Sequence, residues 1–246
     1  MINNIIKLTP EFFLRIWLKF KWKKNDKFKA LSTQQIFSKI YDENIWGIDN
    51  KNNFCSGPGT TTPNIIKYID FLKFFIKQHN IKNIIDLGCG DYQIMKVIMD
   101  EDPELNYTGI DIVPQLIDHN RKIFGSNRIK FVCLNAITDE LPVGDLIIVR
   151  QVLQHLNNSQ IQLILGKLIR YKYVLISEHL PTENITPNID KLAGPKNRLI
   201  FNSGVFLNKP PFSIKAKRVF EFKDADYKDL KNIIRESVIA TYLIEY

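Results

Sequence analysis

One short segment constrains the fold of this 246-residue chain more than any other, the run Ile-Ile-Asp-Leu-Gly-Cys-Gly-Asp over residues 84–91. An apolar strand leads into the acidic Asp86 and then into a turn that contains Gly88 and Gly90. Glycine in such a turn permits positive φ and lets a ligand approach the backbone closely. A helix is expected to follow over residues 92–100, with an inward face of Ile94, Met95, Val97 and Ile98. The segment therefore predicts a strand–turn–helix unit for a nucleotide-like ligand.

Two details narrow the choice of ligand. A dinucleotide fingerprint needs a third glycine three residues after Gly90, and Gln93 stands there. The Asp86 carboxylate would also repel a pyrophosphate, whereas S-adenosylmethionine (SAM) brings an α-ammonium, a sulfonium and no phosphate. About twenty residues further on, an apolar strand ends at Asp111, where a carboxylate can accept hydrogen bonds from both hydroxyls of an adenosine ribose. Together these features favour SAM.

At this point the chain resembles the class I SAM-dependent methyltransferases. Residues 86–90 read like the first motif of that family, and residues 109–111 read like the second. Asn135 and Ala136 stand where the family usually has an Asp-Ala pair that touches the adenine, so Asn135 departs from the pattern. Residues 145–156 resemble the family's fourth strand and the turn after it.

The resemblance implies a Rossmann-like α/β fold, with a doubly wound, mostly parallel, seven-stranded sheet and an antiparallel hairpin at its C-terminal end. It also implies a SAM-dependent methyltransferase activity. The cofactor-binding residues expected on this basis are Trp46, Gly57, Asp86, Gly88, Cys89, Gly90, Asp111, Ile112, Asn135, Ala136, Arg150 and Gln151. No spacing of Cys, His and Asp makes a convincing metal site, so none is predicted; a metal-dependent mechanism stays open as an alternative, since carboxylates from distant loops could meet.

Strands and helices are expected to alternate along the core. Apolar runs predict strands over 82–87, 106–111, 129–133, 144–150 and 172–178, which suit a parallel sheet buried on both faces. Helical spacing predicts helices over 64–78, 91–100, 114–124 and 158–170, the last capped by Asn157 or Asn158. In the tail, strands are expected over 218–222 and 238–245, separated by a polar helix around 227–235.

We expect a helical or lid-like extension over residues 1–62 and the methyltransferase domain over 63–246. Trp46-Gly47, followed by the Ser-Gly-Pro-Gly-Thr run at 56–60, resembles a pattern in bacterial and viral enzymes that methylate sugars and surface glycans. It is interpreted as a lid over the cofactor and the acceptor; the alternative is an ordinary helix-capping turn. The proline-rich residues 181–213 are predicted to be an acceptor-binding insertion, because so long an irregular connection usually has a function.

Residues 9–24 are aromatic and basic and have the length of a helix. This helix could lie on a membrane surface, or it could pack on the domain or on a second subunit in a homodimer. With three cysteines, no leader and no apolar run long enough to span a bilayer, the chain is expected to be cytoplasmic, or peripheral to a membrane. The net charge is +8, in a chain that is rich in Lys, Ile and Asn together. The charge gives mild support to an anionic acceptor, and no nucleic-acid partner is expected.

Methyl transfer to a hydroxyl needs a base. Two histidines are candidates, His155 after the predicted fourth strand and His179 after the predicted fifth strand. His179 is favoured, whereas His155 could equally pack or touch the cofactor. Arg150 could hold an anionic acceptor or pair with an acid.

We therefore expect a SAM-dependent O-methyltransferase that acts on a hydroxyl of a sugar, nucleotide-sugar or phosphorylated glycan precursor. The alternatives are an RNA, protein or small-metabolite methyltransferase, or a non-catalytic SAM-binding protein.

Overall fold

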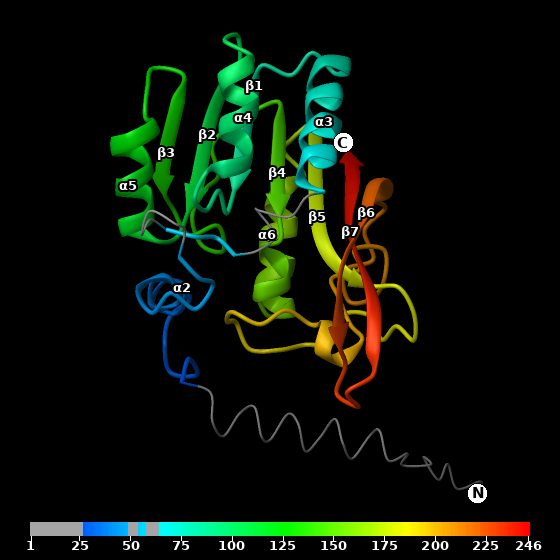
Figure 1. Cartoon of the computed structure of the whole chain (residues 1–246). Helices are drawn as coiled ribbons and strands as arrows, with labels where there is room; N and C mark the ends of the chain where they lie inside the picture. Colours follow the sequence, from blue (N-terminus) through cyan, green and yellow to red (C-terminus); the bar gives the residue numbers. More distant parts are fainter. Residues whose placement is uncertain (1–26, 49–53, 58–63) are drawn as a thin grey trace, which may run out of the picture.

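The chain folds around one seven-stranded sheet in the order β3-β2-β1-β4-β5-β7-β6, seen here in a computed structural model (Figure 1). The structure describes residues 27–48, 54–57 and 64–246. The predicted helix over 9–24 and the Pro58 to Thr60 part of the lid lie outside the described residues. Strands β1 to β5 run parallel, and β7 is antiparallel to both β5 and β6. The predicted fold class is confirmed.

The five parallel strands lie where the sequence predicts them. They are β1 (Asn83–Leu87), β2 (Asn106–Asp111), β3 (Ile129–Cys133), β4 (Leu146–Arg150) and β5 (Tyr173–Pro181). Strand β5 is longer than predicted, because its pairing with β7 continues as far as Pro181 and Ser237. His179 therefore lies within β5 and does not follow it.

Helices cover both faces of the sheet. The predicted ones are α3 (Ile65–Gln78), α4 (Gln93–Glu101), α5 (Pro114–Phe124) and α6 (Asn158–Leu168). Side chains of α3 and α4 belong to one buried apolar cluster and those of α6 to another, one on each side of the sheet. Asn157 caps α6, since its side chain accepts a hydrogen bond from the backbone of Gln160, as predicted.

The inward face of α4 differs from the prediction at one position. Met95, Ile98 and Met99 are buried, whereas Val97 is 38% exposed. Residues 95, 98 and 99 are spaced by three and four, so they share one side of a helix, and a residue two places from Met95 points away from it.

The N-terminal part contains a helix that the sequence reading passed over, α2 (Thr33–Asp42). Ser32 accepts a hydrogen bond from the backbone of Gln35, and the Gln35 side chain accepts one from the backbone of Ser32. This Ser-x-x-Gln capping box was a readable signal for the start of a helix. Tyr41 of α2 packs with the start of α5, so this segment lies beside the carboxyl end of β2.

The prediction of a polar helix around residues 227–235 is wrong. Strands β6 (Lys217–Lys228) and β7 (Ile234–Glu245) form one long hairpin instead. The Asp229 side chain accepts hydrogen bonds from the backbone of Lys231 and Ile233, which stabilises a tight turn between the strands. The polar side chains in this stretch belong to an exposed hairpin.

Among the described residues, none of the helices combines the length and the apolar character needed to cross a membrane. Cys55, Cys89 and Cys133 are free thiols.

Candidate functional site

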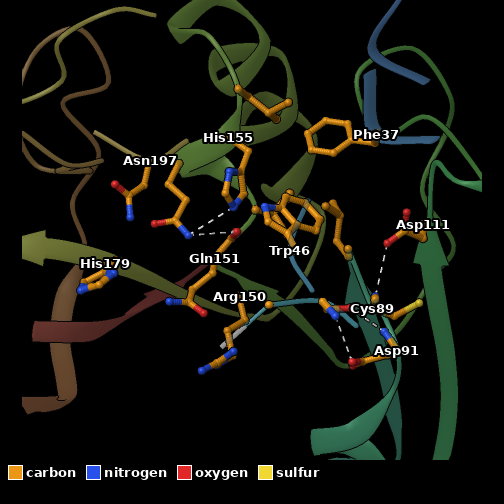
Figure 2. A pocket seen from close by; sticks show the side chains of 18 of the residues that line it. Phe37, Trp46, Cys89, Asp91, Asp111, Arg150, Gln151, His155, His179 and Asn197 are labelled. Carbon is orange, nitrogen blue, oxygen red and sulfur yellow. Dashed lines mark hydrogen bonds between the residues drawn. The ribbon is translucent and has the colours of Figure 1, made fainter. Parts of the chain in front are cut away.

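A cavity of about 630 Å³ opens at the carboxyl ends of the parallel strands (Figure 2). Small-molecule sites commonly have volumes of roughly 300–1,000 Å³, and ligands of open α/β sheets bind at this edge. Every residue that the sequence predicted for the site, His155 and His179 included, lines this cavity. Which of them touch a ligand stays a prediction.

The glycine turn after β1 forms the floor. Gly88 has φ +76° and Gly90 has φ +54°, and a Cβ atom at either position would lie within 2.3 Å of Val152 or Ser56. The backbone N–H groups of Gly88 and Cys89 both donate to the carbonyl of Ile110, so the turn is fixed to β2. Glycine is required here for space as well as for conformation.

Two carboxylates stand beside this floor. The Tyr107 hydroxyl donates to Asp86 over 2.8 Å, and the backbone N–H groups of Gly90 and Val113 donate to Asp111. Burial raises the pKa of Asp86 and of Asp111 to about 6. A cationic or hydroxyl-bearing ligand would favour the ionised form of both groups.

Residues 54–57 close one side of the cavity, held there by two reciprocal hydrogen bonds between Ser56 and Asp91. The Ser56 backbone donates to the Asp91 carboxylate over 3.0 Å, and the Asp91 backbone donates to the Ser56 hydroxyl over 2.8 Å. Tyr41 bonds the same hydroxyl at 2.9 Å. Ser56, Asp91 and Tyr41 were missed as site residues, because the partners are far apart in the chain.

Trp46 continues this wall. Its ring centroid lies 5.5 Å from that of Tyr41 and 5.0 Å from that of His155, and its indole N–H donates to the carbonyl of Pro195. The predicted lid residues Trp46 and Gly57 thus stand over the cavity, next to the insertion that begins at residue 181.

His155 lies in a short 3₁₀ turn after β4, η2 (Leu153–His155). Its Nδ1 is 3.2 Å from the carbonyl oxygen of Gly194, which can only accept, so Nδ1 carries the proton. Its Nε2 then accepts from the Gln154 side-chain amide at 3.4 Å. Burial lowers the pKa of His155 to about 3, which keeps the ring neutral.

Two buried ionisable side chains, Glu178 and Arg198, hold η2 from opposite sides. The Glu178 carboxylate accepts from the backbone N–H groups of Leu153 and Gln154. The Arg198 guanidinium, 1% exposed, lies on the other side of the turn. It donates to the carbonyls of Leu153, Gln154, Leu156 and Ile189 and to the side chain of Asn158. Neither residue was predicted, since an acid inside β5 and an arginine inside an irregular loop carry no local signal.

Arg150 ends β4 at the middle of the cavity. Its guanidinium carbon lies 5.1 Å from the centroid of the Tyr68 ring. Burial lowers the pKa of Arg150, while the nearby acids Asp86, Asp224 and Glu178 oppose that shift. The positive charge therefore faces acids of the protein, and a role in holding an anionic acceptor stays a prediction.

His179 lies at the far end of the cavity from Asp111 (Figure 2). Its Nε2 is 2.7 Å from the Ser237 hydroxyl and 3.3 Å from the Asp224 carboxylate. Burial and Arg150 lower the pKa of His179, and Asp224 opposes them. Asp224 and Ser237 come from the hairpin that was partly expected to be a helix, which is why they were missed.

Asn135 and Ala136 line the cavity beyond β3. The Asn135 side chain accepts from the backbone of Ile137, and the Asp139 carboxylate accepts from the backbone of Asn135. Asn135 thus stabilises the turn that borders the cavity. Within the described residues, no group of three or more His, Cys, Asp or Glu side chains could hold a metal ion.

Comparison with known proteins agrees with this geometry. Residues 85–171 match the family model described as a methyltransferase domain. The matched residues run from β1 through α6 and include the glycine turn, Asp111 and the η2 turn, so the matched segment contributes most of the cavity floor.

A curated relative is the malonyl-[acyl-carrier protein] O-methyltransferase of Acetivibrio thermocellus (strain ATCC 27405). It is 34% identical over 77 residues, which are 31% of this chain and 27% of the relative. The match thus spans about a quarter of that relative's length.

Solved structures are also similar. Human N-acetylserotonin methyltransferase in complex with SAM is 15% identical, with a TM-score of 0.49 over 93% of this chain and 65% of that one. The N-methyltransferase NodS from Bradyrhizobium japonicum WM9, in complex with S-adenosyl-L-homocysteine, is 12% identical, with a TM-score of 0.48 over 74% and 88%. Both TM-scores are below 0.5, so neither similarity adds to the description of this fold.

Proposed function

We propose that this chain is a SAM-dependent O-methyltransferase that transfers a methyl group to a hydroxyl of a sugar, a nucleotide-sugar or a related glycan precursor. The observation that carries the proposal is the meeting of the glycine turn, Asp86 and Asp111 in one cavity. The match of residues 85–171 to a methyltransferase domain supports the reaction class.

The residues present suit SAM. Gly88 and Gly90 leave a cradle that a Cβ atom would fill, and the two carboxylates beside it suit an ammonium group and ribose hydroxyls. We assign Asp86 to the cationic methionine end and Asp111 to the ribose, with Asn135 and Ala136 beside the adenine. When bound, SAM supplies a methyl group that its sulfonium activates.

The acceptor is assigned to the opposite end, between residues 195–200 of the insertion and the bulged part of β6. Asn197, Asp226 and Lys228 line this end, so it offers hydrogen-bonding groups of both charges and a neutral amide. Such a lining suits a polyhydroxylated acceptor, and because Arg150 faces acids of the protein, an anionic group on that acceptor is not required.

Transfer to a hydroxyl needs the acceptor oxygen in line with the methyl–sulfur bond, and a base for its proton. His155 and His179 both line the cavity. The Nε2 of His155 already accepts from Gln154, so His179 is the better candidate. Trp46, packed on His155, would help to exclude water from the reacting atoms.

Calorimetry with SAM and with S-adenosylhomocysteine tests the cofactor assignment. Binding to the full chain is expected, with at least a tenfold loss in Asp111→Ala and none in a surface control such as Arg170→Met. A radiolabelled-SAM screen over sugar nucleotides, oligosaccharides, RNA and protein then tests the acceptor class. Absence of SAM binding would overturn the proposal, and label transfer to RNA or protein alone would overturn the acceptor assignment.

A further inference from the structure

The hairpin contributes an unusual stretch of strand to the cavity. Five consecutive residues of β6, Asp224 to Lys228, all line it. In a regular strand successive side chains point to opposite faces of the sheet. The register between β6 and β7 shifts between Asp224 and Tyr227, which marks a bulge. Bulges re-aim side chains and are common next to active sites. Asp224 is the last residue before the shift; it pairs with Ser237 of β7, and its carboxylate lies 3.3 Å from Nε2 of His179.

The hydrogen bonds fix which nitrogen of His179 carries a proton. The Ser237 hydroxyl donates its single hydrogen to the carbonyl of Ala225, at 2.8 Å. The same hydroxyl is 2.7 Å from Nε2 of His179, so it accepts there and Nε2 must donate. The Asp224 carboxylate, 3.3 Å from Nε2, is a second acceptor for that proton.

Nδ1 of the neutral ring is therefore the nitrogen with a lone pair. Within the described part of the chain, the hydrogen bonds of the His179 ring all involve Nε2. The ring is 13% exposed and lines the acceptor end of the cavity. In His155, by contrast, the lone pair on Nε2 faces an amide donor.

We infer that His179 is the catalytic base through Nδ1, and that Asp224 and Ser237 are positioning residues that hold it in the required tautomer. This inference rests on the proposed function and deepens it. The antiparallel hairpin thereby becomes part of the acid–base machinery, while the methyltransferase domain match, residues 85–171, contains none of these three residues.

The proposed step balances as follows. The acceptor oxygen forms a bond to the methyl carbon, and the carbon–sulfur bond breaks with its electron pair left on sulfur. The hydroxyl proton moves from the oxygen to Nδ1 of His179. The products are a methyl ether, a neutral thioether and an imidazolium ion, so the positive charge passes from sulfur to the ring.

Two charged groups face the ring and act on it in opposite senses. Asp224 on β6 stabilises the imidazolium that forms, and Arg150 on β4 disfavours it. Because the Ser237 hydroxyl accepts a hydrogen bond from Nε2 of His179 whether or not Asp224 is charged, the two positioning residues have separable effects. Ser237 fixes the tautomer, and Asp224 also sets the basicity.

Nitrogen-15 NMR of histidine-labelled protein tests the tautomer without any cofactor or acceptor. The chain has four histidines. The signals are assigned with three variants, His79→Gln, His119→Gln and His179→Gln; His79 and His119 are not among the residues that line the cavity. The wild-type ring of His179 is expected to be neutral near pH 7.5 with Nε2 protonated. In Asp224→Asn it should become protonated only at a lower pH than in the wild type.

The matched control is Glu221→Gln on the same strand, since Glu221 is 49% exposed and pairs with Arg218 at the surface. It should leave the His179 signals unchanged. A wild-type ring protonated on Nδ1, or a titration that is the same in Asp224→Asn, would overturn the assignment.

Kinetics with an acceptor from the labelled-SAM screen give the second readout. Asp224→Asn is expected to lower kcat at least about tenfold, and His179→Gln by roughly 10²–10⁴-fold, the usual range for loss of a general base. SAM affinity should stay within about twofold of wild type, and the pH–rate profile of Asp224→Asn should change, whereas that of Glu221→Gln should not. Full activity in His179→Gln would refute the base assignment, while loss of SAM binding in the wild type would instead refute the proposed function.

Discussion

Replacement of Arg198 by methionine is expected to destabilise the protein by about 3–5 kcal/mol, the usual result of removing one partner from a buried, hydrogen-bonded charge network. The guanidinium is 1% exposed and donates five hydrogen bonds around η2. The carbonyl of Leu153 keeps a second donor, the backbone of Leu156. Those of Gln154, Leu156 and Ile189 lose a charged donor in the interior, at about 1–3 kcal/mol each before relaxation.

Relaxation of the surrounding structure and entry of water should keep the loss of stability below the sum of the costs for these three carbonyls. Arg198→Lys retains the charge with three donors in place of five, so an intermediate loss is expected. The matched control is Arg170→Met, because Arg170 is 48% exposed and pairs with Glu140 at the surface. Such a pair contributes about 0–1 kcal/mol.

Urea unfolding followed by circular dichroism measures these differences. With m-values of roughly 1–3 kcal/mol/M, the midpoint of Arg198→Met should fall by more than about 1 M, and that of Arg170→Met by much less. Equal midpoints for the two variants would refute the view that Arg198 holds the η2 turn in place.

Two further predictions concern the cofactor end. Gly90→Ala should abolish SAM binding in calorimetry, because its Cβ would lie 2.2 Å from the Ser56 hydroxyl at a φ of +54°. The control is Gly166→Ala, in α6 with open space around the position, which should bind SAM normally and gain up to about 1 kcal/mol of stability. SAM affinity should weaken below about pH 6, by up to tenfold per pH unit for each coupled proton. Asp86 and Asp111 have pKa values of about 6, and in the ionised form they best bind the groups assigned to them, the cationic methionine end and the ribose hydroxyls. Both pKa values are raised by folding, so the stability that these two carboxyls contribute is lost as the pH rises from 4 through 6, whereas His155, whose pKa is lowered to about 3, contributes in the opposite sense. A pH-independent affinity would contradict the assignment of these carboxylates.

Patterns that are local in the sequence predicted the sheet and the cofactor end well. The apolar runs of β1 to β5 lie in a sheet covered on both faces, so continuous hydrophobicity identifies them. The glycine turn and Asp111 have a fixed relation to the strands they follow, so their meeting in one cavity follows from the fold. The structure places these groups in one cavity, and their role in cofactor binding stays a prediction.

The rest depended on contacts between distant segments. A polar, half-exposed hairpin has little periodic signal, so residues 227–235 were mistaken for a helix and Asp224 was missed. Burial of Glu178 and Arg198 depends on both reaching the η2 turn, which no window of sequence reveals. The prediction that Val97 faces inward was wrong for a simpler reason. The buried apolar side of α4 is narrower than the run of hydrophobic residues suggests.

The strand order has a consequence for how the site assembles during folding. Strand β6 joins the sheet only through β7, which is inserted between β5 and β6. Asp224 therefore reaches His179 only after β7 has paired with both neighbours, a set of long-range contacts that form slowly in folding. A folding intermediate that has its parallel strands but lacks the hairpin would present the nucleotide-binding floor without a positioned base. Ligand affinity and catalytic competence should then appear at separate times during refolding.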